Sequence, residues 1–132
     1  MEFLTPVEFW PGDWIRVFVP RLGVWHHGIV RQVSHGAFFM VEVAHNMKLT
    51  GITVTDLNTF ADGQLVFLHR RPVPYQVPEI LARVDANMGR PYHLFAQNCE
   101  HFASFAFTGR AESTSVKAGV LTAAIIIGFL GS

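Results

Sequence analysis

Short apolar runs alternate with turn residues through the first half of the chain. Pro11-Gly12-Asp13 is a turn signal before the first run, and glycine, proline or polar breaks separate most of the others. Runs of this length that are rich in valine, isoleucine and aromatic residues predict β-strands, and the two runs on either side of residues 34–36 predict an antiparallel hairpin. The expected strands cover residues 14–19, 24–33, 37–44, 51–55 and 64–69.

Helical spacing follows a proline-rich connector at residues 70–78. Apolar residues recur three or four positions apart over residues 79–88, which predicts a helix that ends at Gly89. A second helix is expected over residues 99–108, with Asn98 as its N-cap and Gly109 as its end. This order of elements predicts an α+β fold, in which a small antiparallel, barrel-like sheet is followed by helices.

The end of the chain forms an apolar segment. Residues 118–131 carry no charged side chain, but they are fewer than the ~20 apolar residues that cross a bilayer. Two interpretations stay open: a buried terminal helix, or a short tail that inserts into a membrane surface. We therefore expect a folded domain over residues 1–112 and an apolar tail over residues 113–132.

Composition narrows the classes of function. Half of the 132 residues are hydrophobic, which predicts one folded domain, and 10 Lys+Arg balance 10 Asp+Glu, so we expect no nucleic-acid partner. A single cysteine, Cys99, excludes a disulfide within the chain and a cysteine-rich zinc site, and we expect neither a metal nor another cofactor. Because the N-terminus does not look like a secretory signal, we expect a cytoplasmic, reducing location, with membrane association only through the tail.

Cys99 is the candidate nucleophile. It falls in the first turn of a predicted helix, where outward-pointing N–H groups and the helix dipole favour a thiolate. The backbone N–H at the same position is suited to hold an oxyanion. The position is compatible with acyl transfer by a thiol, but taken alone a single cysteine is more often a buried core residue.

A thiol nucleophile needs a base, and histidines supply the candidates. Along an extended strand His26 shares a face with Gly28, and His27 lies on the other face. Gly28 leaves room for a helix to approach, which makes His26 the preferred base and His27 the second choice. On the facing strand, His45 lies where it could orient His26 as the third member of a triad.

The segment Asn98-Cys99-Glu100-His101-Phe102 resembles the nucleophile box of the lecithin:retinol acyltransferase-like family. These proteins are circularly permuted relatives of papain-like thiol hydrolases. His26-His27-Gly28-Ile29 resembles the family's base motif, Val43-Ala44-His45 resembles its second histidine strand, and Pro11-Gly12-Asp13 resembles its opening turn. The order of two histidine motifs before the cysteine is the permuted order of this family, and the resemblance covers about residues 8–110 together with the apolar tail.

The resemblance implies roles for these residues. Cys99 would be the nucleophile, His26 the general base and His45 its orienting partner, while Tyr92 would form or support the oxyanion site. Position 27 carries a histidine where the family usually has an aromatic residue, so both His26 and His27 stay candidates for the base. The separation of His26 from His45 is longer than the resemblance leads us to expect, and His35 is therefore the alternative third member.

The resemblance also implies a substrate class. We expect a thiol acyltransferase or phospholipase that acts on acyl esters of phospholipids through an acyl-cysteine, with a membrane surface as a second partner. The alternative enzyme is a cysteine amidase or peptidase of the same superfamily. Two non-enzymatic hypotheses are a membrane-associated adaptor that keeps the fold and a redox-sensing thiol, although the chain has no second cysteine to resolve an oxidised Cys99.

Overall fold

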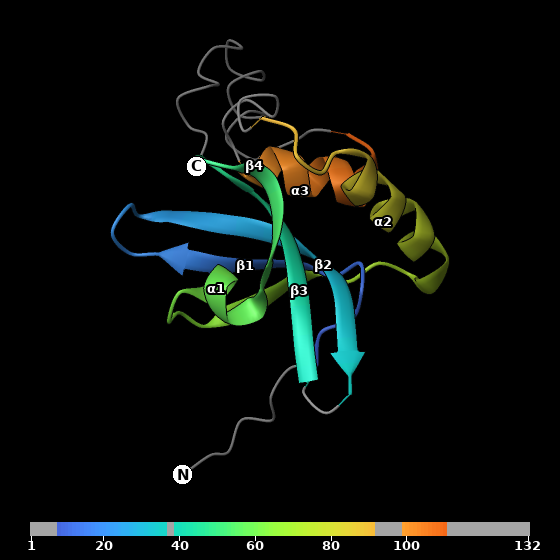
Figure 1. Cartoon of the computed structure of the whole chain (residues 1–132), viewed down its shortest axis with the longest axis horizontal. Coiled ribbons are helices and arrows are strands. Elements are labelled where there is room, and N and C mark those ends of the chain that lie inside the picture. Colours follow the sequence, from blue (N-terminus) through green and yellow to red (C-terminus); the bar gives the residue numbers. More distant parts are fainter. Residues whose placement is uncertain (1–7, 37–38, 92–98, 111–132) are drawn as a thin grey trace.

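A five-stranded antiparallel sheet forms the centre of the computed structural model, which describes residues 8–36, 39–91 and 99–110 (Figure 1). The strands lie in the order β4-β3-β2-β1-β5, so β4 and β5 are the edges. Their bounds are β1 (Trp14–Val19), β2 (Val24–His35), β3 (Phe39–Met47), β4 (Gly51–Asp56) and β5 (Val66–Arg70). All five expected strands are therefore present, with ends shifted by up to three residues.

The helices follow the sequence expectation with one addition. The addition is a short helix that the sequence analysis did not predict, α1 (Leu57–Ala61), whose N-cap Asp56 accepts a 2.7 Å hydrogen bond from the Thr59 N–H. After a 3-10 turn, η1 (Pro74–Gln76), comes α2 (Val77–Ala86). It begins two residues earlier than predicted, because proline fits the first turn of a helix, and also ends two residues earlier.

The third helix, α3 (Cys99–Thr108), has the predicted bounds. Gly109 ends it with a φ of +85° and donates its N–H to the Phe105 carbonyl over 2.7 Å. The predicted N-cap, Asn98, lies outside the described residues.

Helices cover both faces of the sheet (Figure 1). On one face α2 and α3 pack against Trp14, Ile29 and Ala44, with Phe102 and Ile80 buried between the layers. On the other face α1 places Phe60 over a second buried cluster, whose members from the sheet include Ile15, Val17, Val30 and Val43. The alternation of β2 therefore decides which of its side chains lie on the α3 face and which on the α1 face.

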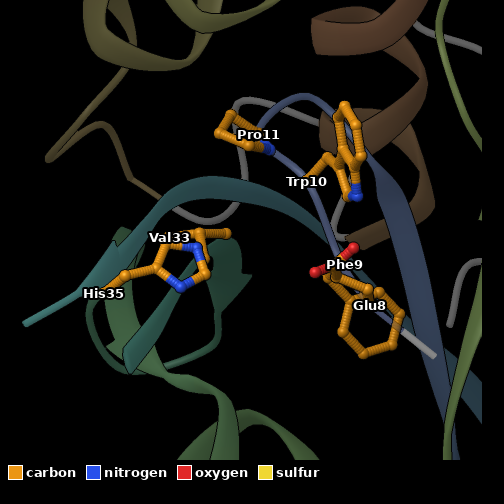
Figure 2. Close-up of a pocket in the computed structure, with 6 residues that line it drawn as sticks. All are labelled: Glu8, Phe9, Trp10, Pro11, Val33 and His35. Carbon is orange, nitrogen blue, oxygen red and sulfur yellow. The ribbon is translucent and has the colours of Figure 1, made fainter. Parts of the chain in front are cut away.

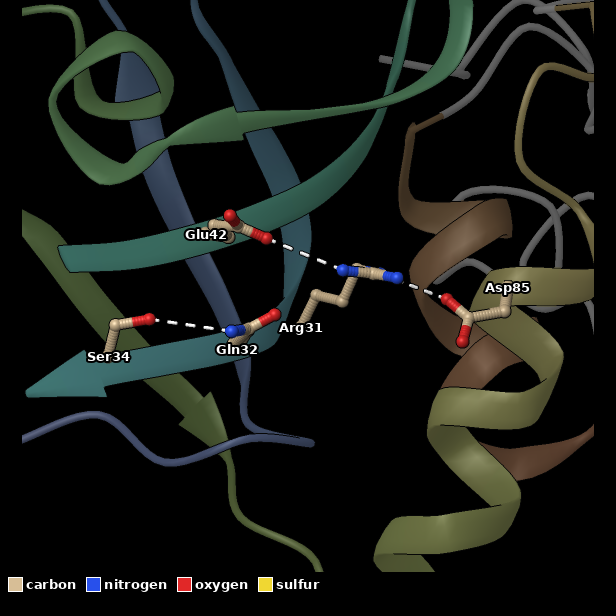
Figure 3. Close-up of polar contacts among 5 residues, drawn as sticks. All are labelled: Arg31, Gln32, Ser34, Glu42 and Asp85. Carbon is tan, nitrogen blue, oxygen red and sulfur yellow. Dashed lines mark hydrogen bonds and ion pairs between the residues drawn. The ribbon is translucent and has the colours of Figure 1, made fainter.

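A β-bulge interrupts that alternation. The register between β2 and β3 shifts between Val30 and Gln32, so Arg31 is the extra residue, and Val33 packs against the same cluster as Val30. Strict alternation thus holds from Trp25 to Val30 and fails beyond. Arg31 reaches Glu42 of β3 at 3.4 Å and Asp85 of α2 at 2.9 Å, which ties the sheet to the helix (Figure 3).

The turn after α2 lies against the edge strand β4. Gly89 donates its N–H to the Ile52 carbonyl over 2.8 Å, and the Ile52 N–H donates to the Arg90 carbonyl over 3.0 Å. Gly51, with a φ of +76°, permits this close approach, because a Cβ there would collide with the Arg90 carbonyl oxygen.

Candidate active site

The Cys99 thiol lies against the main chain of β2. Its sulfur accepts the His27 N–H at 3.4 Å and donates to the Trp25 carbonyl at 3.5 Å, so it contacts the backbone on both sides of His26. The side chain is 3% exposed. The structure therefore brings the first residue of α3 to the part of β2 that carries the two candidate bases.

The end of β3 explains why a sulfur atom fits there. The N–H and C=O of Val30 are hydrogen-bonded to Asp13 and Gly12, on the β1 side of β2. Because these groups point to opposite sides in successive residues of a strand, the N–H and C=O of Trp25 and His27 point to the β3 side. The pairing of β2 with β3 stops at Gly28, opposite His45. Beyond that pair β3 continues to Met47 beside β4 alone, and the Cys99 sulfur contacts the backbone groups of Trp25 and His27 on β2 instead.

His26 and His45 form a direct side-chain pair. His26 Nε2 lies 2.8 Å from His45 Nδ1, and the ring centroids are 5.0 Å apart in an edge arrangement. Both rings contact Phe60 of α1. The two histidines thus share one face of the sheet, as the alternation of β2 and β3 predicted.

Gly28 was expected to leave room for a helix to approach the sheet, and the helix that does so is α1. A Cβ at this position would meet Phe60 at 2.8 Å and Val43 at 2.6 Å. The helix that approaches the His26 face is therefore α1, through Phe60, whereas α3 packs on the opposite face.

His45 has a second partner that the sequence did not reveal. Its Nε2 lies 2.9 Å from the Thr55 hydroxyl on β4, and that hydroxyl donates to the Asp56 carbonyl over 3.2 Å. Thr55 is two residues from Thr53, the Cα partner of His45, and so on the same face of β4. A chain of contacts therefore runs from His26 through His45 to Thr55.

The His27 ring has other partners than the His26 ring. The indole Nε1 of Trp14 donates a 2.9 Å hydrogen bond to His27 Nδ1, and His69 lies edge-on at 5.8 Å between ring centroids. Its ring is on the α3 face of the sheet, away from the His26–His45 pair.

Burial keeps these imidazoles neutral. Loss of water contact lowers the pKa of His26 to about 4 and the pKa of His45 to about 3. The pKa of His27 falls to about 3, through burial first and then through the positive potentials of His69 and Arg16. At neutral pH all three rings therefore have a lone pair, which a general base requires.

A cavity of about 710 Å³ opens beside the histidine pair. His26, His45 and Phe60 line it, together with the turns after β1 and β3, which contribute Arg21 and Lys48. Within the described ranges no three His, Cys, Asp or Glu side chains gather as a metal site would need.

The remaining residues that the sequence analysis singled out do not join the His26–His45 pair in the described structure. His35 ends β2 nine residues from His26, ~30 Å along an extended strand, so it cannot contact that ring. It lines a separate cavity of about 290 Å³ with Val33, Trp10 and Glu8 (Figure 2). Tyr92, expected at the oxyanion site, and the apolar tail lie outside the described residues.

The family model for lecithin retinol acyltransferase matches residues 8–112. The chain belongs to this family. Membership indicates acyltransferase or thiol hydrolase chemistry in general, and the family typically uses a cysteine on acyl-ester lipids. A comparison with curated proteins finds no match for the chain. In the part of the chain that the structure describes, no helix is both long and apolar enough to span a bilayer.

Proposed function

We propose that this protein is a thiol acyltransferase or phospholipase that takes an acyl group from a phospholipid ester through an acyl-Cys99 intermediate. The fold would be a circularly permuted papain-like one. The order of His26 and His45 before Cys99 along the chain supports this, because permutation puts the base strands ahead of the nucleophile helix.

One observation carries the proposal: the Cys99 sulfur contacts the backbone on both sides of His26, while the His26 ring is paired with His45. A thiol held against the strand that carries the base, with a third group orienting that base, is compatible with covalent acyl transfer. Family membership supplies the preference for acyl esters of lipids.

Acylation would begin with transfer of the Cys99 proton to His26. The thiolate attacks the ester carbonyl carbon, and the carbonyl electron pair moves to oxygen to form a tetrahedral oxyanion. Collapse of that intermediate breaks the ester C–O bond, and protonated His26 gives its proton to the departing alkoxide. The products are a thioester on Cys99 and a lysophospholipid, with His26 neutral again.

Deacylation repeats these steps with a second nucleophile. His26 takes a proton from water, or from an alcohol or amine acceptor, as that nucleophile attacks the thioester carbonyl. The Cys99 thiolate then leaves and recovers the proton from His26. Water gives a free fatty acid, so the protein acts as a phospholipase, and another acceptor gives acyl transfer.

The cavity beside His26 has features that suit such a substrate. Phe60 and Val17 supply apolar lining, whereas Arg21 and Lys48 place positive charge on turns of the chain. An ester substrate with an acyl chain and an anionic phosphodiester matches both properties. Among the described residues that line the cavity, Asp62 is the one whose negative charge opposes an anion.

Intact-protein mass spectrometry tests the proposal. The full chain and Cys99→Ala are incubated with mixed phospholipid vesicles, and lipid products are measured in the same samples. We expect the wild type alone to gain the mass of a fatty acyl group, or to release fatty acid if deacylation is fast. Absence of both adduct and product on vesicles and on soluble ester probes would overturn the assignment, and an adduct with amide probes alone would make the protein an amidase.

A further inference from the structure

The proton positions along the His26–His45–Thr55 chain depend on one another. A neutral imidazole carries a proton on one ring nitrogen and a lone pair on the other, so each ring in the chain donates on one side and accepts on the other. The hydrogen bonds join His26 Nε2 to His45 Nδ1 at 2.8 Å and His45 Nε2 to the Thr55 hydroxyl at 2.9 Å. Whatever fixes the proton at one end of this chain therefore fixes it at the other.

The Thr55 hydroxyl supplies that fixed end. It has a single proton, which it directs to the Asp56 carbonyl 3.2 Å away. The hydroxyl oxygen must then accept from His45 Nε2–H, and His45 Nδ1 is left with a lone pair. That lone pair accepts from His26 Nε2–H, so the lone pair of His26 is on Nδ1.

The opposite arrangement would disable the base. If the Thr55 hydroxyl donated to His45 Nε2, the His45 proton would move to Nδ1 and point at His26 Nε2. His26 would then carry its proton on Nδ1 and spend its only lone pair on His45. In that state neither ring nitrogen of His26 could take a proton from a thiol.

We propose that Thr55 is a positioning residue, which uses its bond to the Asp56 carbonyl to hold His45 as the Nε2–H tautomer and so keeps the Nδ1 lone pair of His26 for the Cys99 proton. The inference rests on the proposed role of His26 as the base. Thr55 does not touch the substrate in this proposal; it acts through His45 alone.

The test compares Thr55→Val, which removes the hydroxyl, with Thr55→Ser, which keeps it. Thr53→Val is the matched control, because Thr53 lies on the same face of the same strand, and the described residues show no hydrogen bond from it to His45. Two quantities are measured for each full-length variant: the tautomers of His26 and His45, by long-range ¹H–¹⁵N correlation at neutral pH, and the rate of Cys99 acylation by a soluble ester. Thermal melting verifies that each variant folds.

In the wild type, Thr55→Ser and Thr53→Val we expect both histidines to be Nε2–H. In Thr55→Val we expect mixed tautomers and an acylation rate lower by on the order of tenfold, less than the 100-fold or more that loss of a general base costs. A folded Thr55→Val with wild-type tautomers would overturn the inference even if acylation slowed. If the wild type shows the expected tautomers but no acylation of Cys99, the proposed function fails while the tautomer assignment stands.

Discussion

The indole Nε1 of Trp14 donates a 2.9 Å hydrogen bond to Nδ1 of His27. Because indole nitrogen is only a donor, this bond fixes His27 as the Nε2–H tautomer and occupies the one lone pair of its ring. His27 therefore lacks a lone pair for the proton of a thiol, and the choice between the two adjacent histidines falls on His26.

His26→Gln should slow acylation of Cys99 by on the order of 100-fold or more, because it removes the general base. His27→Gln is the matched control: the glutamine carbonyl can still accept the Trp14 N–H, so we expect a far smaller loss. The rate is followed with a soluble ester by intact-mass spectrometry. A larger loss in His27→Gln than in His26→Gln would make His27 the base.

Acid should destabilise the fold through the buried histidines. Their pKa values in the folded protein, about 3 to 4, lie below the ordinary value of 6.5, so the unfolded chain binds more protons between these limits. The free energy of unfolding should therefore fall as the pH drops from about 6.5 toward 4, by up to ~1.4 kcal/mol per pH unit for each histidine. Urea denaturation at several pH values measures the slope, and a flat profile over this window would show that these rings are not buried as neutral groups.

Gly28→Ala should destabilise the protein by about 1–3 kcal/mol. The added Cβ would meet Val43 at 2.6 Å, Phe60 at 2.8 Å and the Ala44 carbonyl oxygen at 3.1 Å, the last of which is backbone and cannot swing aside. Gly36→Ala is the control, since no atom of the described residues lies within 4 Å of a Cβ there. Chemical denaturation of both variants checks the difference; equal stabilities would mean that α1 shifts freely away from the sheet.

The ion pair of Arg71 with Asp13 and the ion pairs of Arg31 should contribute differently to the free energy of unfolding. Arg71 donates from Nε and an η nitrogen to the two carboxylate oxygens of Asp13, at 2.9 and 2.8 Å, and the Asp13 side chain is fully buried. Arg71→Met leaves that carboxylate with fewer donors and should cost about 2–3 kcal/mol. Arg31→Met breaks partly exposed pairs and should cost ~1 kcal/mol or less.

Measurement of both variants in low and high salt separates the two cases. Salt screens exposed charges more than buried ones, so the Arg31 effect should shrink in salt and the Arg71 effect should persist. If Arg71→Met proved as mild as Arg31→Met, the Trp10 N–H that also donates to Asp13 would be sufficient to hold the carboxylate.

Local patterns predicted the parts of the site that depend on local geometry. Strand alternation put His26 and His45 on one face, because side-chain direction in a strand repeats every two residues. The start of α3 at Cys99 and its end before Gly109 followed from residues within one turn of each end. These features could be predicted because side-chain direction and helix ends are determined by residues close in sequence.

The parts of the fold and of the site that could not be predicted depend on contacts between segments far apart in the sequence. Helix α1 has five residues, too few to show a helical period, yet its Phe60 covers the histidine pair. The bulge at Arg31 reversed the alternation near the end of β2, and no residue there signals it. Thr55 could not be distinguished from Thr53 before the pairing of β3 with β4 was known.

The contact of the Gly89–Arg90 turn with β4 has a consequence for association between molecules. An edge strand offers unpaired N–H and C=O groups that a strand of another chain can join. Here the N–H and C=O of Ile52 are already bonded to Arg90 and Gly89. A foreign strand would first have to displace this turn, so the start of β4 is protected against intermolecular sheet extension, and Gly51 is the residue whose small size makes that protection sterically feasible.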